Sequence, residues 1–155
     1  MPELAPDFVY VTYIAAGAER VWNGLLDPEL TRLYWKHANV SDWNPGSTWQ
    51  HVSSDENPTV DIVGTVVEFD APRRMVLTWS LPGDAADEAK VSRVTFEVTP
   101  LGPDAKLEIT HSGLQAASDM QAGIETGWPV VCCNLKTLLE TGHTLSDEMW
   151  QSLFP

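Results

Sequence analysis

The feature that most constrains this chain is a change in the spacing of its apolar residues. Between residues 39 and 113 apolar side chains recur at about every second position, which is the period of a β-strand. After residue 117 the spacing becomes three or four, as in Met120, Ile124, Trp128 and Val131, which marks one face of an α-helix. A strand region followed by one long amphipathic helix predicts an α+β fold in which the helix covers one face of a sheet.

Turn residues divide the strand region into five segments. Clusters rich in Pro, Gly, Asn and Asp lie between strands that we predict at residues 47–53, 59–69, 74–81, 90–99 and 105–112. An earlier β-branched and aromatic run at residues 8–14 predicts a first strand. The connections are short enough to join antiparallel neighbours, so we expect a sheet of about six strands.

Two short helices are expected between the first strand and the others. Val21, Trp22, Leu25 and Leu26 form an apolar helical stripe, and Asp27 followed by proline then starts a second helix that runs to about residue 35. The residues after 117 predict the long helix, which Gly142 would end.

Pro129 leaves the start of the long helix open. Proline has no amide hydrogen, so the helix either bends there or begins near Gly127, with residues 115–126 as a separate segment. The tail, residues 143–155, shows no regular period, but its apolar residues predict that it docks. We therefore expect residues 1–155 to form a single domain.

The charge and the cysteines exclude several classes of protein. The net charge of -13 would repel nucleic acid and anionic membranes, so neither is expected as a partner. The N-terminus has no signal peptide pattern, which predicts a cytoplasmic protein. Cys132 and Cys133 are adjacent, and on a helix their side chains diverge too far to form a disulfide.

Strand alternation and aromatic content predict which residues line an interior cavity. His111 shares one face of its strand with Leu107 and Ile109 and should point inward, either as a core histidine or as a hydrogen-bonding group for a ligand. Seven Trp residues suit a pocket for flat aromatic ligands, although each alone is more simply a core residue. The candidate cavity-lining residues are Trp22, Trp35, Trp49, Trp79, Phe96, Ile109, His111, Trp128 and Cys132.

No motif in the sequence predicts a catalytic, metal or cofactor site. His37, His51 and Asp42 or Asp61 do not follow the spacing of a metal-binding motif. The chain contains neither a nucleophile elbow nor a glycine-rich phosphate or dinucleotide loop. We therefore predict no catalytic residue, no metal ligand and no cofactor.

The segments resemble, in order, the activator of heat-shock protein 90 ATPase homologue family, of the START-like (SRPBCC) superfamily that includes birch-pollen-allergen-like proteins. The matching residues are 18–22, 25–30, 34–35, 64–79, 111–114 and 127–128, with Leu135, Leu138 and Leu139. The resemblance implies a helix-grip fold, in which a curved antiparallel sheet wraps around the long C-terminal helix and leaves a cavity between them.

Three functions follow from this resemblance, in decreasing order of preference. The first is binding of a small hydrophobic ligand, aromatic or polycyclic, in the cavity. The second is an enzyme of the cyclase, dehydratase or hydrolase kind that uses the same cavity, although the sequence offers only His111 for it. The third is a co-chaperone contact, for which the eukaryotic activators use an additional N-terminal domain that this sequence does not show. Exposed strands or the aromatic tail could also support a homodimer.

Overall fold

The computed structural model describes residues 2–155 and confirms the predicted α+β architecture. One antiparallel sheet is built from the strands β1 (Phe8–Ile14), β2 (His37–Ser41), β3 (Thr48–Ser53), β4 (Val60–Asp70), β5 (Arg74–Trp79), β6 (Ser92–Leu101) and β7 (Asp104–Ser112). Their order across the sheet is β1-β7-β6-β5-β4-β3-β2. The helices are α1 (Ala18–Leu26), α2 (Pro28–Tyr34), α3 (Asp119–Thr141) and α4 (Asp147–Leu153), with short 3-10 turns η1 (Pro82–Asp84) and η2 (Glu88–Lys90).

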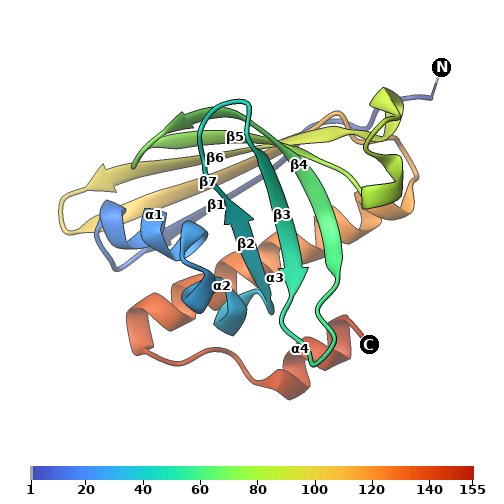
Figure 1. Ribbon diagram of the computed structural model, residues 1–155. Helices are drawn as coiled ribbons and strands as arrows, with labels where there is room; N and C mark the ends of the chain where they lie inside the picture. Colours follow the sequence, from blue (N-terminus) through green and yellow to red (C-terminus); the bar gives the residue numbers. More distant parts are fainter. Residues whose placement is uncertain (1) are drawn as a thin grey trace.

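The curved sheet grips the long helix, as the resemblance implied. In Figure 1, α3 crosses beneath the sheet, α1 and α2 lie at one end of it, and α4 lies near the ends of β3 and β4. Apolar side chains of the sheet and the helices meet in one buried core. None of the helices in residues 2–155 is long and apolar enough to cross a bilayer.

The five predicted strands of the middle region and the first strand are confirmed to within two residues at most ends. The sheet also contains β2, which was not predicted, so it has seven strands. β2 pairs with β3 along its whole length, from His37 opposite Ser53 to Ser41 opposite Trp49. Its five residues include Ala and Asn, which have little intrinsic preference for strands, so pairing with β3 rather than local propensity forms this strand.

The long helix is continuous, so a start near Gly127 is wrong. Helix α3 begins at Asp119, where the Ser118 hydroxyl accepts a hydrogen bond from the Gln121 amide at 3.1 Å. Pro129 lies inside the helix. Its missing donor costs one helical hydrogen bond, but buried residues on both sides of it, such as Ile124 and Val131, hold the helix against the core.

The tail forms a helix that its apolar spacing did not predict. The Ser146 hydroxyl accepts a hydrogen bond from the Met149 amide and caps the start of α4. Two further contacts hold this segment: Lys36 donates to Asp147 at 2.7 Å, and the Leu145 amide donates to the side chain of Asn134 at 2.7 Å.

Gly64 lies where β4 passes from pairing with β3 to pairing with β5. β4 pairs with β3 through its first half and with β5 through its second half, and its register shifts between Val66 and Glu68. A Cβ atom on Gly64 would overlap the carbonyl oxygen of Thr78 and crowd the indole nitrogen of Trp49. Glycine therefore permits the close approach that lets Trp49 donate to this carbonyl oxygen at 2.8 Å.

Candidate functional site

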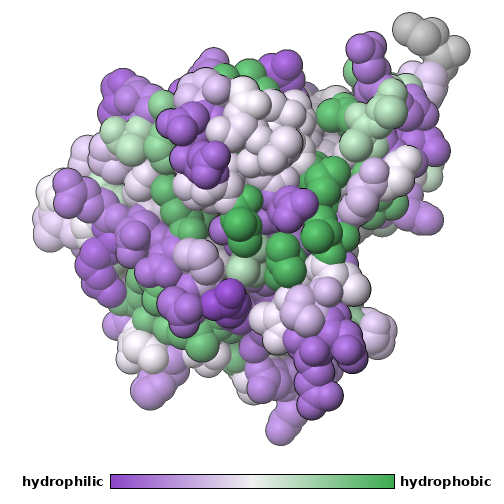
Figure 2. Space-filling view, in the orientation of Figure 1, coloured by the Kyte–Doolittle hydropathy of each residue, from purple (hydrophilic) through white to green (hydrophobic). Residues whose placement is uncertain are grey.

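A cavity of about 370 Å³ lies between α3, the sheet and α4. Most of its wall is apolar. The lining residues are Trp35, His37, His51, Asp61, Ile62, Trp79, Leu81, Met120, Gly123, Ile124, Gly127, Trp128, Val131, Trp150 and Phe154. Figure 2 shows hydrophobic residues that reach the surface in the middle of this face of the molecule, with hydrophilic residues around them.

Three of the predicted candidates, Trp35, Trp79 and Trp128, line this cavity. They come from the end of α2, from β5 and from α3, and their rings meet. The ring centroids of Trp128 lie 5.3 Å from those of Trp35 and 5.5 Å from those of Trp79. Each of the three is at least nine-tenths buried. The tryptophans that singly look like core residues therefore converge on one wall.

The other six candidates lie in the core and are not part of the cavity wall. They are Trp22, Trp49, Phe96, Ile109, His111 and Cys132. Phe96 packs edge-on against Trp128 with a centroid distance of 5.6 Å, and Trp49 packs against Trp79 at 5.5 Å. Phe96 and Trp49 thus pack against the cavity-lining rings of Trp128 and Trp79 without lining the cavity themselves. Burial raises the pKa of the Cys132 thiol, with a smaller effect of Cys133, so this thiol stays neutral.

His111 is a fully paired core histidine. Its Nδ1 atom accepts a hydrogen bond from the Trp128 indole at 3.1 Å, so its proton is on Nε2, which donates to the Ser92 hydroxyl at 2.8 Å. Ser92 in turn lies 3.3 Å from the Trp79 carbonyl oxygen, to which it donates. Burial lowers the pKa of His111 to about 3, so the ring is neutral. Of the two roles considered for His111, the contacts support the core role.

The inward-facing strand histidine that lines the cavity is His51, on β3, and not His111. The ring is 4% exposed and lies on the cavity wall. Its Nδ1 atom lies 2.6 Å from the side-chain oxygen of Asn39, and the amide group of Asn39 donates to the Leu25 carbonyl oxygen at 3.3 Å. An amide oxygen only accepts, so Nδ1 of His51 carries the proton and Nε2 does not. Burial, together with the charge of His37, holds the pKa of His51 well below its usual range.

His37 and Asp61 form a polar edge to the cavity. The rings of His37 and His51 stack with a centroid distance of 4.0 Å and an angle of 6°. His37 faces an acceptor on each side: the Trp35 carbonyl oxygen at 2.9 Å from Nδ1 and the Asp61 carboxylate at 2.8 Å from Nε2. Both contacts are satisfied when both ring nitrogens carry protons. Burial opposes a low pKa for Asp61, but hydrogen bonds from His37 and Thr59 outweigh it and lower that pKa.

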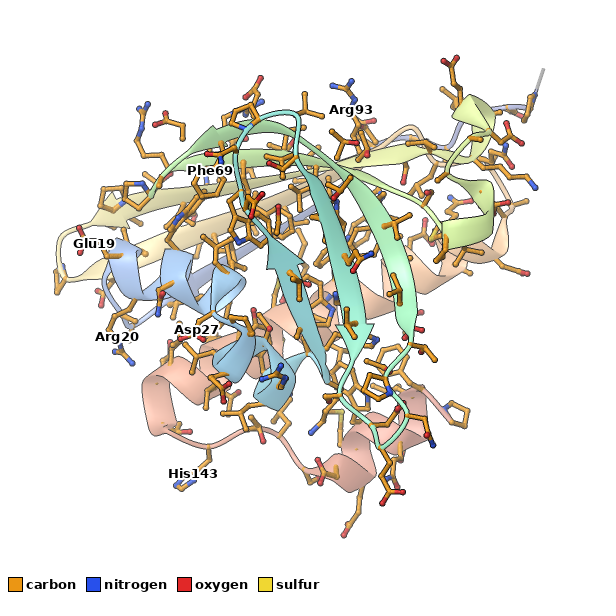
Figure 3. All side chains as sticks on the ribbon, in the orientation of Figure 1. Glu19, Arg20, Asp27, Phe69, Arg93 and His143 are labelled. Carbon is orange, nitrogen blue, oxygen red and sulfur yellow. The ribbon has the colours of Figure 1, made fainter. Side chains whose placement is uncertain are left out.

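The three polar residues do not converge as metal ligands. Stacked rings direct their nitrogen lone pairs side by side rather than toward one point, and three of the four ring nitrogens already have protein partners. No group of three His, Cys, Asp or Glu side chains within residues 2–155 has an arrangement that could hold a metal ion. In Figure 3, side chains fill the space between the sheet and α3, whereas Arg93 and His143 point away from it.

Comparison with known proteins places the chain in a family. Residues 15–140 match the family described as Activator of Hsp90 ATPase homolog 1-like protein. The chain belongs to this family. No curated protein matches the sequence at a significant level.

Solved structures share the fold of this Hsp90-activator-homologue family member. CalU16 from Micromonospora echinospora superimposes with a TM-score of 0.70 at 20% identity, over 96% of this chain and 81% of that chain. An Hsp90 activator from Plasmodium falciparum gives a TM-score of 0.71 at 21% identity, over 87% and 96% of the two chains. The Aha1 dimer from Colwellia psychrerythraea gives 0.68 at 18% identity, over 89% and 98%. At these identities the likeness shows the fold.

Sequence reasoning missed most of the polar wall and the tail of this family member. His37, His51 and Asp61 were weighed only as metal ligands, and Trp150 and Phe154 only as a docking tail. A signal for His51 was present, because it alternates with Trp49 on the same face of its strand. Nothing local in the sequence indicates that Trp150 and Phe154 reach the same cavity as Trp35.

Proposed function

We propose that this protein binds a small hydrophobic ligand with an aromatic ring in the cavity between α3 and the sheet. The observation that carries the proposal is the cavity of about 370 Å³ with Trp35, Trp79 and Trp128 on its wall. This volume lies within the range of about 300 to 1,000 Å³ that is usual for small-molecule sites. Indole rings that meet at one wall offer flat, polarisable surfaces on which an aromatic ligand can stack.

Two glycines of α3 support this proposal because they leave the cavity open. Gly123 and Gly127 are four residues apart, so they lie on one face of the helix, and both line the cavity. A Cβ atom built on either residue meets nothing within 4 Å. Glycine inside a helix costs about 1 kcal/mol relative to alanine. The chain thus carries two residues that lower helix stability at positions on the cavity wall, where a larger side chain would meet no other residue.

The proposal is tested by binding measurements on the purified protein. Native mass spectrometry after incubation with flavonoids, polyketide-like aromatics and fatty acids should show one ligand per chain for at least one aromatic compound. Tryptophan fluorescence should titrate with the same compound, because the binding wall contains indoles. The compound should leave the protein with its mass unchanged.

A variant that fills the cavity provides the control. Gly127→Leu places a side chain into open space, so it should abolish binding while the free energy of unfolding stays the same or rises. Gly83→Leu is the matched control, because Gly83 also has open space around it but does not line the cavity. If Gly127→Leu bound the ligand as tightly as the wild type, the cavity would not be the binding site.

An enzyme that uses the same cavity is the second candidate. The observation that favours it is the group of polar residues on the wall: His51 with an unprotonated nitrogen, next to the paired His37 and Asp61. A neutral imidazole nitrogen beside a hydrogen-bonded histidine and carboxylate offers the groups that proton transfer uses. A ligand whose mass changes during incubation, and does so only with the protein present, would favour the enzyme over the binding protein.

A further inference from the structure

One acceptor nitrogen on the cavity wall, Nε2 of His51, has no hydrogen-bond partner among residues 2–155. Within residues 2–155, the Nε2 atom of His51 makes no hydrogen bond, whereas its Nδ1 atom is paired with Asn39. Among these residues, Nε1 of Trp79 is the one side-chain N or O atom that is fully buried and makes no hydrogen bond. His51 Nε2 also makes no hydrogen bond, but this atom is not fully buried, and His51 lines the cavity. This nitrogen therefore opens onto the space where a ligand would lie.

The surrounding residues fix this nitrogen as an acceptor. Asn39 is 4% exposed, and its amide orientation is set because its NH₂ group donates to the carbonyl oxygen of Leu25. Its oxygen atom is then held toward Nδ1 of His51, which must carry the proton. On the other side, His37 stacks on the ring and keeps it in place. His51 thus presents a lone pair, in a fixed direction, before any ligand arrives.

His37 and His111 are excluded from the same role by their contacts. Both ring nitrogens of His37 face acceptors, namely the Trp35 carbonyl oxygen and Asp61. Both ring nitrogens of His111 are paired within the core. His51 is the one imidazole on this wall with a free acceptor, and it lies between the polar edge formed by His37 and Asp61 and apolar residues such as Ile62.

We infer that His51 Nε2 accepts a hydrogen bond from a hydroxyl group on the ring of the bound ligand, so that the ligand class is a phenol or enol rather than a plain hydrocarbon. This inference rests on the proposed function. A hydroxyl group matches a neutral imidazole nitrogen because it supplies the missing donor. A ligand without a donor would cover the nitrogen and leave it unpaired, which weakens binding.

The test compares two ring compounds of one skeleton, 2-naphthol and 2-methoxynaphthalene, by isothermal titration calorimetry at pH 7. We expect the wild type to bind 2-naphthol about tenfold more tightly, the usual effect of one hydrogen bond gained and one unpaired group avoided. His51→Asn retains a donor toward Asn39 but removes the Nε2 position. It should bind both compounds with equal affinity. Ile124→Val is the matched control, which should weaken both compounds equally and keep the preference.

Each outcome distinguishes the inference from the proposed function. Equal affinity of the wild type for both compounds would overturn the inference and leave the binding function standing. Failure of both compounds to bind would count against an aromatic ligand altogether. A preference that persists in His51→Asn would mean that another group recognises the hydroxyl.

A measurement on the wild type covers the case in which His51→Asn does not fold. In two-bond ¹H–¹⁵N spectra of the histidine rings, the Nε2 resonance of His51 should move when 2-naphthol binds. It should move much less with 2-methoxynaphthalene, which has no proton to donate. An Nε2 resonance that responds equally to the two compounds would overturn the inference.

Discussion

Burial of two neutral histidines should make this protein lose stability between pH 7 and pH 5. Burial lowers the pKa of His111 to about 3 from an ordinary value of 6.5, and the pKa of His51 is lowered in the same direction. In the unfolded chain both rings take up a proton near pH 6.5. The unfolded state therefore binds more protons than the folded state between about pH 6.5 and pH 3. The stability from these groups is complete above that range and is lost as the pH falls through it.

The size of the effect follows from the two pKa values of His111. With 6.5 unfolded and about 3 folded, lowering the pH from 7 to 5 reduces the free energy of unfolding by about 2 kcal/mol. The lowered pKa of His51 adds a further loss in the same direction. Asp61 and Glu140 have lowered pKa values and lose their contributions mainly below pH 5. The window from pH 7 to pH 5 therefore reports chiefly on histidines.

Urea unfolding, followed by tryptophan fluorescence at pH 7, 6 and 5, measures this loss. His111→Gln removes one titrating ring, so its stability should fall by about 2 kcal/mol less than that of the wild type over the same range. The comparison uses the change in the free energy of unfolding with pH. This change does not depend on how much the substitution itself destabilises the core. His143→Gln is the control, because His143 points away from the protein (Figure 3) and should leave the slope unchanged.

Two results would refute this reasoning. A wild-type free energy of unfolding that stayed constant from pH 7 to pH 5 would mean that the buried rings take up protons in the folded state. A slope in His111→Gln equal to the wild-type slope would mean that His111 does not cause the loss.

Three further substitutions test the packing around the site by urea unfolding. Gly64→Ala should cost about 3 kcal/mol or more because its Cβ would overlap the backbone of β5, whereas Gly83→Ala, in open space, should stay within about 0.5 kcal/mol. Asn134→Ala should cost about 2 kcal/mol and speed proteolysis of the tail, since it unpairs the Leu145 amide. Trp79→Ala should cost about 3 to 5 kcal/mol by emptying a core position; a change below 1 kcal/mol would contradict the core role.

The parts of the fold that the sequence predicts are those with strong local patterns. β5 alternates apolar residues with a clear period of two and was found near its true limits. The apolar stripe of α3 predicted the helix and its end at Gly142, whereas Pro129 left its start open. β2 has no such pattern and exists because β3 lies beside it. α4 is short, and its local signals were the capping Ser146 and the acidic residues Asp147 and Glu148 in its first turn.

The cavity was predictable as a consequence of the fold, but its wall was only partly so. Trp79 and Trp128 could be placed inward because strand and helix periods assign each one to a face, whereas Trp35, just past the end of α2, was a candidate for its aromatic ring alone. Whether a buried ring then touches open space or other side chains depends on residues far away in the chain. Phe96 and Trp79 are both buried, yet Phe96 packs edge-on against Trp128 and does not line the cavity, whereas Trp79 does.

The two buried histidines show which information decides between packing and function. His51 and His111 both lie at inward strand positions, and burial lowers both pKa values, so neither alternation nor charge distinguishes them. The difference lies in the second ring nitrogen. The Nε2 of His111 is paired with Ser92 on a neighbouring strand, whereas the Nε2 of His51 is paired with nothing in residues 2–155. A ligand without a donor that covered this Nε2 atom would leave it buried and unpaired, which costs about 1 to 3 kcal/mol. The fold holds the His51 ring in one tautomer, with Nε2 as an unpaired acceptor on the cavity wall. This nitrogen can therefore accept a hydrogen bond from a donor on the ligand.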